Sequence, residues 1–227
     1  MIERTVSRGG TVVIPAFAVG RAQSLIYQLW RLKQAGRLKN VPIYLDSPMA
    51  TSATELLCRH NVDHKLTADE CAAACGAVNY IRDVEESKAL SANRYPKVII
   101  SASGMATGGR VLHHIAAFGV DHRNTLLFSG FQAAGTRGRK LLQGAREVKI
   151  YGQWIPVNAE VTELPMLSAH ADCDELMQWL SNFERPPRHV FIVHGEPDAS
   201  EALRERIIRE LGWSVSVPLQ DQVQELD

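Results

Sequence analysis

The first residue that could do chemistry is His170, in the sequence Ser-Ala-His-Ala-Asp. Asp172, followed three residues later by Glu175, fits a capping box, so we expect a helix to begin directly after Asp172. His170 would then lie in the tight turn between a strand and this helix, where functional side chains of α/β proteins gather. His170 is therefore a candidate functional residue, and the alternative is that it only packs or caps locally.

The second candidate is His194, in the sequence Val-His-Gly-Glu, which ends at Glu196. The mostly apolar residues 189–193 predict a buried strand, and Gly195 lets the chain turn away without a side chain that blocks access. A histidine exposed at the end of a buried strand suits a metal ligand or a proton donor. As a lone histidine it would more often be structural.

Two glycine-rich segments could bind an anion. In residues 101–110, Ser103, Gly108 and Gly109 precede Arg110 and a predicted helix, so free backbone N–H groups and one cation would lie together. The segment is neither a Walker A sequence nor a G-x-G-x-x-G fingerprint, and a tight turn that needs small residues explains it equally well. The second segment, residues 135–140 with Arg137, is basic, but such a loop alone is more often a solvated surface turn.

The elements that would position these residues alternate between strand and helix. Short β-branched or apolar runs predict strands at 11–16, 41–45, 97–101 and 125–128, and helical spacing predicts helices at 20–36, 51–58 and 110–118. This rhythm favours an α/β fold with a mostly parallel sheet. His113 and His114 are neighbours in the last of these helices and diverge in direction, so at least one is expected to pack.

After residue 144 the pattern changes. Short runs at 148–150, 154–157 and 159–164 follow each other without a helix, which favours antiparallel pairing in a different sheet. A helix at 173–183, a strand at 189–193, a helix at 199–211 and a strand at 215–218 complete the chain. We therefore expect two domains, 1–143 and 144–227.

Composition narrows the class of protein further. Lys plus Arg and Asp plus Glu number 25 each, so the formal net charge is zero and any nucleic-acid binding must come from local arrangement. The four cysteines lack the spacing of a zinc finger, so we expect buried or idle thiols in a reducing compartment. No run of apolar residues is long enough to span a membrane and residues 1–10 have no signal-peptide core, so we expect a cytoplasmic protein.

Six motifs taken together resemble the β-CASP nucleases, which are enzymes of the metallo-β-lactamase fold. The group includes the endonuclease of eukaryotic messenger-RNA 3′-end processing and its bacterial and archaeal relatives. The motifs occur in family order as GGTVVIPAFAVGRAQ (9–23), SPMA (47–50), SASGMATGGR (101–110), SGFQAAGTRGR (129–139), SAHAD (168–172) and VHGE (193–196). The resemblance implies that 1–143 are most of a β-CASP domain and that 144–227 are the C-terminal part of a metallo-β-lactamase αββα sandwich.

The resemblance also implies roles for single residues. His170 matches the histidine that protonates the leaving oxygen as a general acid, and His194 matches a ligand of one of two zinc ions, with Asp172 and Glu196 in support. The two glycine-rich loops would face an RNA channel, which favours phosphate contacts by Arg110 and Arg137. The activity implied is two-metal hydrolysis of the phosphodiesters of RNA.

The family's first metal motif, H-x-H-x-D-H, does not occur in the 227 residues. Because a catalytic zinc ion takes about three protein ligands, His194 alone cannot hold one. We therefore expect a fragment whose partners are RNA and either a missing N-terminal half or a second copy of itself. A non-catalytic RNA-binding or scaffolding module is the alternative, whereas a serine hydrolase is disfavoured because no G-x-S-x-G motif is present. We also expect the isolated chain to aggregate or to dimerise through 144–227.

Overall fold

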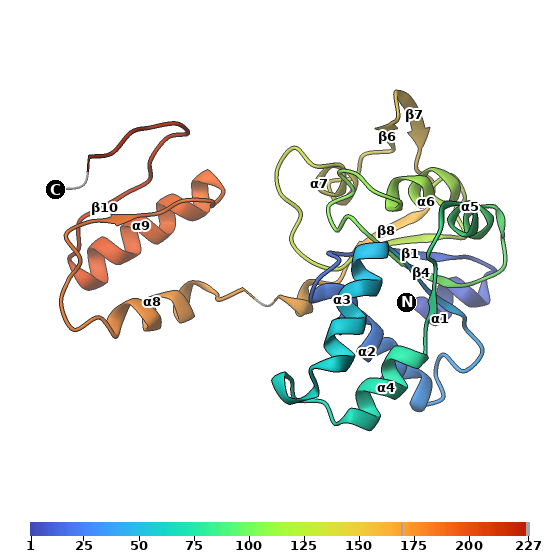
Figure 1. The fold of residues 1–227 in the computed structure, drawn as a ribbon. Helices are drawn as coiled ribbons and strands as arrows, with labels where there is room; N and C mark the ends of the chain where they lie inside the picture. The colour runs from blue at the N-terminus through green and yellow to red at the C-terminus, as the bar shows by residue number, and fades with distance from the viewer. Residues whose placement is uncertain (169, 226–227) are drawn as a thin grey trace. The chain divides into compact units, whose positions relative to one another are not determined.

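The computed structural model describes residues 1–168 and 170–225 of the chain. The chain divides into two compact units, Met1–Ser168 and Ala169–Asp227, and each unit has its own sheet (Figure 1). Each unit also has its own hydrophobic core. Over the described residues, no helix has both the length and the apolar character that a membrane crossing requires.

The first unit is built on a six-stranded sheet with the strand order β3-β2-β4-β1-β5-β8. Its strands are β1 (Val12–Pro15), β2 (Ile43–Asp46), β3 (Asn79–Tyr80), β4 (Val98–Ser101), β5 (Thr125–Phe128) and β8 (Glu160–Glu163). All of the pairings between them are parallel. β1, β4 and β5 are buried along their whole length, which explains their continuous β-branched and apolar sequences. The predicted mostly parallel α/β fold is confirmed.

Helices cover both faces of this sheet. Residues of α1 (Ile2–Ser7), α2 (Arg21–Gln34) and α3 (Pro48–Arg59) pack into one core with alternate strand residues such as Val12 and Ile14. Residues of α5 (Val84–Ala92), α6 (Val111–Phe118) and α7 (Arg137–Leu142) pack into a second core with Val13 on the opposite face. The 3-10 turn η1 (Asn61–Asp63) and α4 (Ala68–Gly76) follow α3, and α4 packs on α2 and α3.

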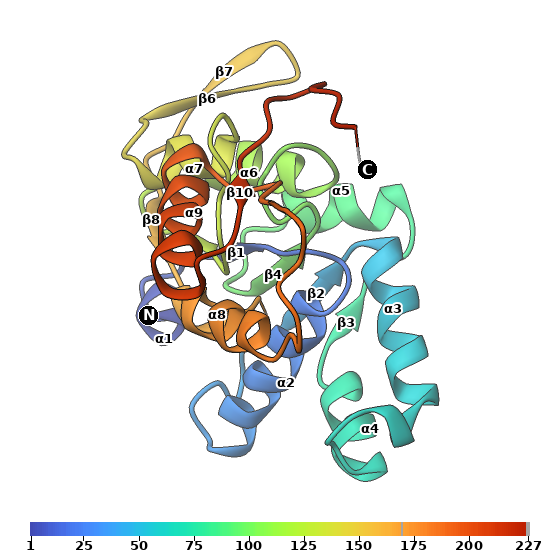
Figure 2. The same ribbon diagram turned by 90° about the vertical axis from the view of Figure 1, so that its left-hand side faces the viewer.

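The strands after residue 144 confirm one prediction and correct another. β6 (Glu147–Ile150) and β7 (Gln153–Pro156) form the expected antiparallel hairpin, which extends past α6 and α7 in Figure 2. β8 was expected in a different, antiparallel sheet, but it pairs in parallel with β5 at the edge of the main sheet. The reason lies in tertiary contacts, since Glu160 forms ion pairs with Arg4 and Arg8, and its N–H donates to the Asn124 carbonyl.

The compact division of the chain falls after β8 and the 3-10 turn η2 (Pro165–Leu167), between Ser168 and Ala169. The hairpin and β8 thus belong to the first unit, although their sequence texture differs from that of the preceding residues. The predicted boundary between a β-CASP domain and a metallo-β-lactamase segment, placed between residues 143 and 144, is a different division from that of the compact units and stays a prediction.

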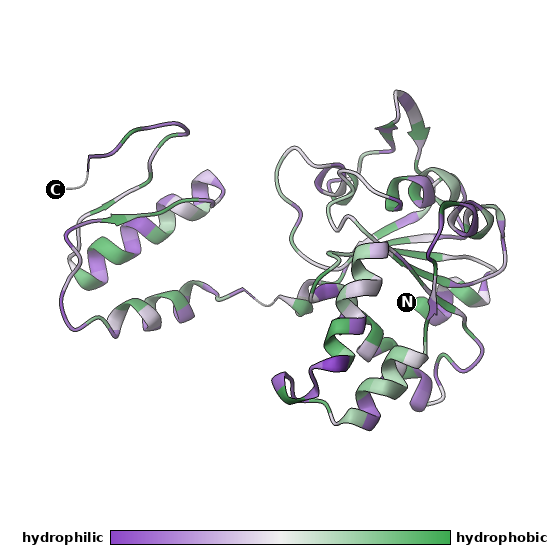
Figure 3. Ribbon diagram, in the orientation of Figure 1, coloured by the Kyte–Doolittle hydropathy of each residue, from purple (hydrophilic) through white to green (hydrophobic). Residues whose placement is uncertain are grey.

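The second unit contains α8 (Cys173–Ser181), β9 (Val190–Phe191), α9 (Pro197–Leu211) and β10 (Val215–Ser216). Hydrophobic and hydrophilic residues alternate along α9 (Figure 3), and its apolar face contributes to a small core of Met177, Leu180, Ile207 and Trp213. β9 pairs only with β10 among the described residues, and both strands are half-buried. The strand predicted at 189–193 is therefore shorter and less buried than expected, and Val193 is 68% exposed.

Candidate functional site

A buried carboxylate, Asp46, lies at the carboxyl end of β2 and is completely inaccessible to solvent. It accepts hydrogen bonds from Ser87 Oγ at 2.5 Å, Arg110 Nη1 at 2.7 Å and His114 Nε2 at 2.7 Å. Because an ionised carboxylate only accepts, the hydrogen of this bond lies on Nε2 of His114. Nδ1 of the same ring lies 3.0 Å from Ser91 Oγ. Sequence patterns gave no sign of this network, which joins β2, α5 and α6, although the burial of one residue of the His113-His114 pair was predicted.

Two opposing effects set the protonation of Asp46. Burial raises the pKa of this carboxyl group. The hydrogen bonds from His114, Ser87 and Arg110 together lower the pKa by more than burial raises it, so the pKa lies below its usual value. Asp46 is therefore ionised at neutral pH. Its role is to hold the end of β2 and the helices α5 and α6 in one arrangement.

Arg110, a predicted phosphate ligand, is fixed by this network. Besides its bond to Asp46, its guanidinium donates to the carbonyls of Ile81 at 3.4 Å and Arg82 at 3.2 Å, and its side chain is only 20% exposed. A phosphate contact by Arg110 stays a prediction, and it would use the guanidinium N–H groups that these three bonds leave over.

The loop before α6 is held together by hydrogen bonds to the side chain of Ser103. Ser103 Oγ accepts the backbone N–H groups of Thr107 at 3.1 Å and Gly108 at 3.3 Å. Gly109 has a positive φ of 77°, and a Cβ there would lie 2.5 Å from the carbonyl oxygen of Ala102. The loop leads directly into α6, as predicted, and Gly109 is the position at which only glycine fits.

Replacing Gly109 by alanine is expected to lower the free energy of unfolding of the first unit by about 2 kcal/mol or more, from left-handed strain and overlap with backbone. Gly108→Ala is the matched control, because a Cβ there meets nothing within 4 Å and the position has no positive φ. Urea unfolding of the two variants measures the difference. Equal losses in both variants would contradict this account of the loop.

The second predicted phosphate ligand is Arg137. A surface turn was expected at 135–140, but the structure has the helix α7 from Arg137 onward. Thr136 accepts the N–H of Arg139 and caps α7, so Arg137 is the first residue of a helix. Its Nε donates to the carbonyl of Lys149 at 2.6 Å and its Nη1 to that of Thr107 at 3.1 Å. Arg137 thus ties the loop before α6 to the β6–β7 hairpin.

A groove lies where this loop, α7 and the hairpin meet. Its lining consists of Thr107, Gly135, Thr136, Arg137, Lys140, Glu147, Val148, Lys149 and Trp154. Three of these residues are cations, and the indole of Trp154 is 61% exposed. Cations beside an open aromatic face suit a ligand with phosphates and planar bases. The sequence did not predict a role for Trp154, because only the folded hairpin brings this residue beside the basic residues of α7.

The predicted histidines lie in the second unit, and both are exposed. The capping box before α8 is confirmed, since Asp172 and Glu175 each accept the other's backbone N–H at 2.9 Å. His170 precedes this cap, as predicted. His194 follows β9 with a positive φ of 69°, and Glu196 is the N-cap residue of α9. A Cβ at Gly195 would lie 2.3 Å from Ser200 Oγ, so the turn after His194 leaves little room for a side chain.

The histidines do not form a metal site by themselves. Among the residues that the structure describes, one group of three potential ligands converges, and it consists of Cys58, Cys71 and Cys75. The donor set at His194 therefore falls short of the three protein ligands that a catalytic zinc ion takes.

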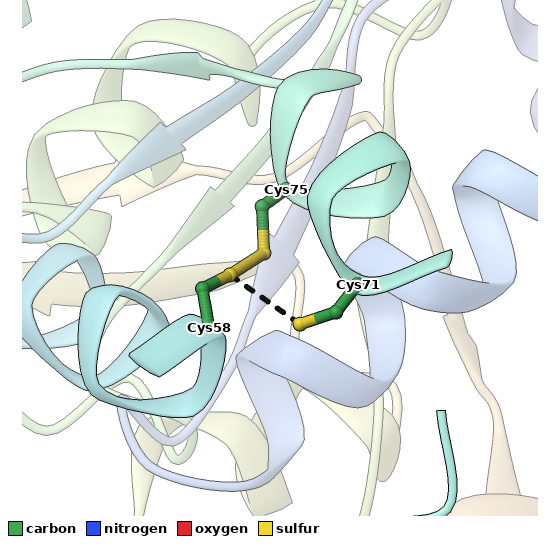
Figure 4. A group of neighbouring side chains, drawn as sticks. All are labelled: Cys58, Cys71 and Cys75. Carbon is green, nitrogen blue, oxygen red and sulfur yellow. Dashed lines mark hydrogen bonds between the residues drawn. A yellow bond between two sulfur atoms is a disulfide. The ribbon is translucent and has the colours of Figure 1, made fainter. Parts of the chain in front are cut away.

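The cysteines correct another expectation. Cys58 and Cys75, expected as buried or idle thiols, form a disulfide, whereas Cys71 is a buried thiol as expected and donates to Cys58 Sγ at 3.4 Å (Figure 4). Burial raises the pKa of the Cys71 thiol, so it stays protonated at neutral pH. Cys173 is a free and exposed thiol in the second unit.

Comparison with protein families identifies the class of protein. Residues 22–141 match the Beta-Casp domain, and residues 154–218 match the Zn-dependent metallo-hydrolase RNA specificity domain. The first match alone covers more than half of the chain. The chain therefore belongs to the β-CASP family of metallo-β-lactamase-fold RNA nucleases, as the six motifs implied.

Three relatives place the chain within this family. It is 37% identical over 209 residues to Ribonuclease TTHA0252 of Thermus thermophilus, covering 89% of this chain and 47% of that protein. It is 30% identical over 222 residues to an RNase J-like protein of Methanocaldococcus jannaschii, covering 98% and 52%. It is 33% identical over 223 residues to transcription termination factor FttA of Methanosarcina mazei, covering 93% and 35%. The chain thus spans between about a third and a half of the length of these relatives.

Proposed function

We propose that the chain is the RNA-binding portion of a zinc-dependent ribonuclease and carries two of its active-site histidines. The observation that supports this most strongly is the succession of two family matches in this chain, a β-CASP domain followed by an RNA specificity domain, together with relatives named as ribonucleases. The reaction proposed is hydrolysis of a phosphodiester bond in RNA.

The groove beside α7 is proposed to hold single-stranded RNA. Arg137, Lys140 and Lys149 would attract the phosphates, and a base would stack on the exposed indole of Trp154. In the adjoining loop the N–H groups of Ser103 and Gly108 already donate within the loop, so a neighbouring phosphate would be bound through the N–H of Gly109. Because the net charge of the chain is zero, binding depends on this local cluster of cations.

Replacing Trp154 by alanine is expected to weaken binding of a short single-stranded RNA about tenfold, because a stacked base contributes about 1–3 kcal/mol. Trp179→Ala is the matched control, since Trp179 is also 61% exposed but lies in α8 of the second unit and is not a lining residue of the groove. Fluorescence anisotropy of a labelled oligonucleotide measures both affinities. The groove is ruled out as the RNA site if Trp154→Ala binds RNA as tightly as the unchanged chain.

For the chemistry, His170 is proposed to donate a proton to the leaving oxygen of the cleaved bond, and His194 to serve as one zinc ligand. Asp172 would support His170 by fixing the start of α8, and Glu196 would support His194 at the start of α9. The further zinc ligands would come from an H-x-H-x-D-H segment outside these 227 residues or on a partner chain.

The experiment is to incubate the 227-residue chain with zinc and end-labelled single-stranded RNA, beside His194→Ala and a chelator control. The expected result is RNA binding without cleavage above the His194→Ala level. Cleavage that both controls abolish would contradict the proposed need for further ligands. If the chain does not bind RNA, the RNA-binding part of the proposal fails.

A further inference from the structure

Three sulfur atoms converge in the first unit, away from the groove. Cys58 lies in the last turn of α3, whereas Cys71 and Cys75 are one helical turn apart on the same face of α4 (Figure 4). All three Sγ atoms lie within 4.8 Å of one another. Three thiols from two packed helices thus surround one point, an arrangement that a single disulfide does not require.

The spacing of the backbone also suits a centre shared by all three sulfurs once the disulfide is reduced. The Cα atoms of Cys58 and Cys75 are 7.6 Å apart. Disulfides usually join Cα atoms about 4.4–6.8 Å apart. A metal ion between the sulfurs lets the two helices keep this larger separation, and it gives Cys71 the same role as its neighbours.

The surroundings suit a soft ion. Cys71 is only 1% exposed. Cys71 and Cys75 also line a small cavity whose other walls are Gln23, Ile26, Tyr27, Thr54, Leu57, Leu66 and Ala74. Thiolates select soft or borderline-soft ions over hard ions such as Mg²⁺.

We propose that the reduced thiols of Cys58, Cys71 and Cys75 bind one thiophilic metal ion of the Zn²⁺ and Cu⁺ class. A dithiol supplies the two electrons and two protons that open the Cys58–Cys75 disulfide and is itself oxidised to a disulfide. A phosphine supplies the two electrons and becomes the phosphine oxide, while water supplies the oxygen and the two protons. Binding of the ion then releases the three thiol protons to solvent as three metal–sulfur bonds form. The ion joins α3 to α4, so its effect is structural, and the site is independent of the proposed RNA hydrolysis.

The test uses the full 227-residue chain, reduced with a phosphine and handled without oxygen. Cd²⁺ is the probe, because its bonds to thiolates absorb in the ultraviolet. The expected result is an absorbance that saturates at one Cd²⁺ per chain and is reversed by competing Zn²⁺ or Cu⁺. Chain oxidised to the Cys58–Cys75 disulfide should not develop this absorbance, and equal binding by oxidised chain would overturn the proposal.

Variants assign the ligands. Cys58→Ser, Cys71→Ser and Cys75→Ser are each expected to weaken Cd²⁺ binding at least 100-fold. Cys173→Ser and His122→Ala should bind Cd²⁺ as the unchanged chain does, since neither residue belongs to the cluster. Cys58 and Cys75 are half-buried, so their variants remain informative if the Cys71 variant does not fold. Unchanged binding in Cys58→Ser or Cys75→Ser, or loss of binding in Cys173→Ser, would overturn the proposal.

Discussion

Replacing Asp46 by asparagine is expected to lower the free energy of unfolding of the first unit by about 3–5 kcal/mol, the usual effect of removing one partner from a buried charged network. The substitution leaves the Arg110 guanidinium beside a neutral group, and the fully buried His114 ring loses its anionic acceptor. The three elements that meet at Asp46 would then lose their common anchor. Urea unfolding followed by circular dichroism measures the loss.

Asp121→Asn is the matched control for this substitution. Asp121 also pairs with an arginine, Arg123, at 2.7 Å, but the pair is exposed to solvent. Hydrogen bonds from Arg123 hold the pKa of Asp121 at about 2, yet screening by water limits an exposed pair to about 1 kcal/mol or less. If both asparagine variants lose the same stability, the network around Asp46 does not organise the unit as argued.

The same network gives the stability a dependence on pH. The pKa of Asp46 is lower in the folded chain than its ordinary value of 3.8. Its contribution is therefore fully present above pH 3.8 and is lost as the pH falls through the lower, folded value. The Asp46→Asn variant should accordingly lose less stability on acidification than the unchanged chain.

Replacing His170 by alanine is expected to slow RNA cleavage by about 10²–10⁴, the range that general acid–base catalysis contributes, without changing RNA affinity. The enzyme for this test is a hybrid in which residues of this chain replace the 209 matched residues of the Thermus ribonuclease relative. Single-turnover cleavage of end-labelled RNA gives the rate, and anisotropy gives the affinity.

His122→Ala provides the control for the histidine substitution, because the His122 side chain is 85% exposed and lies in the first unit. Its cleavage rate should match that of the unchanged hybrid. A His170→Ala rate within threefold of this control would contradict the role of His170 as proton donor.

The sequence predicted best the elements whose own pattern determines their structure. The β-branched run at 11–16 became β1, and the leucines spaced three or four apart became the buried face of α2. The strand at 160–163 has no such pattern, because Glu-Val-Thr-Glu fits either sheet equally well. Glu160 forms ion pairs with arginines near the start of the chain, and these contacts place the strand at the edge of the main sheet. A prediction from the local sequence pattern does not include such long-range contacts.

The site divides in the same way. His170 and His194 could be located from local turn and cap signals, and the exposure of His194 at the end of a strand was predicted. Asp46, Trp154 and the cysteine cluster depend on contacts between elements far apart in the sequence.

The most direct test of the central proposal, that this chain contributes to RNA hydrolysis, is zinc-dependent cleavage by the hybrid with and without His194. The predicted result is cleavage of single-stranded RNA that a chelator abolishes and that His194→Ala reduces at least 100-fold, while RNA affinity stays the same. Cleavage by the His194→Ala hybrid at the rate of the unchanged hybrid would contradict the proposal.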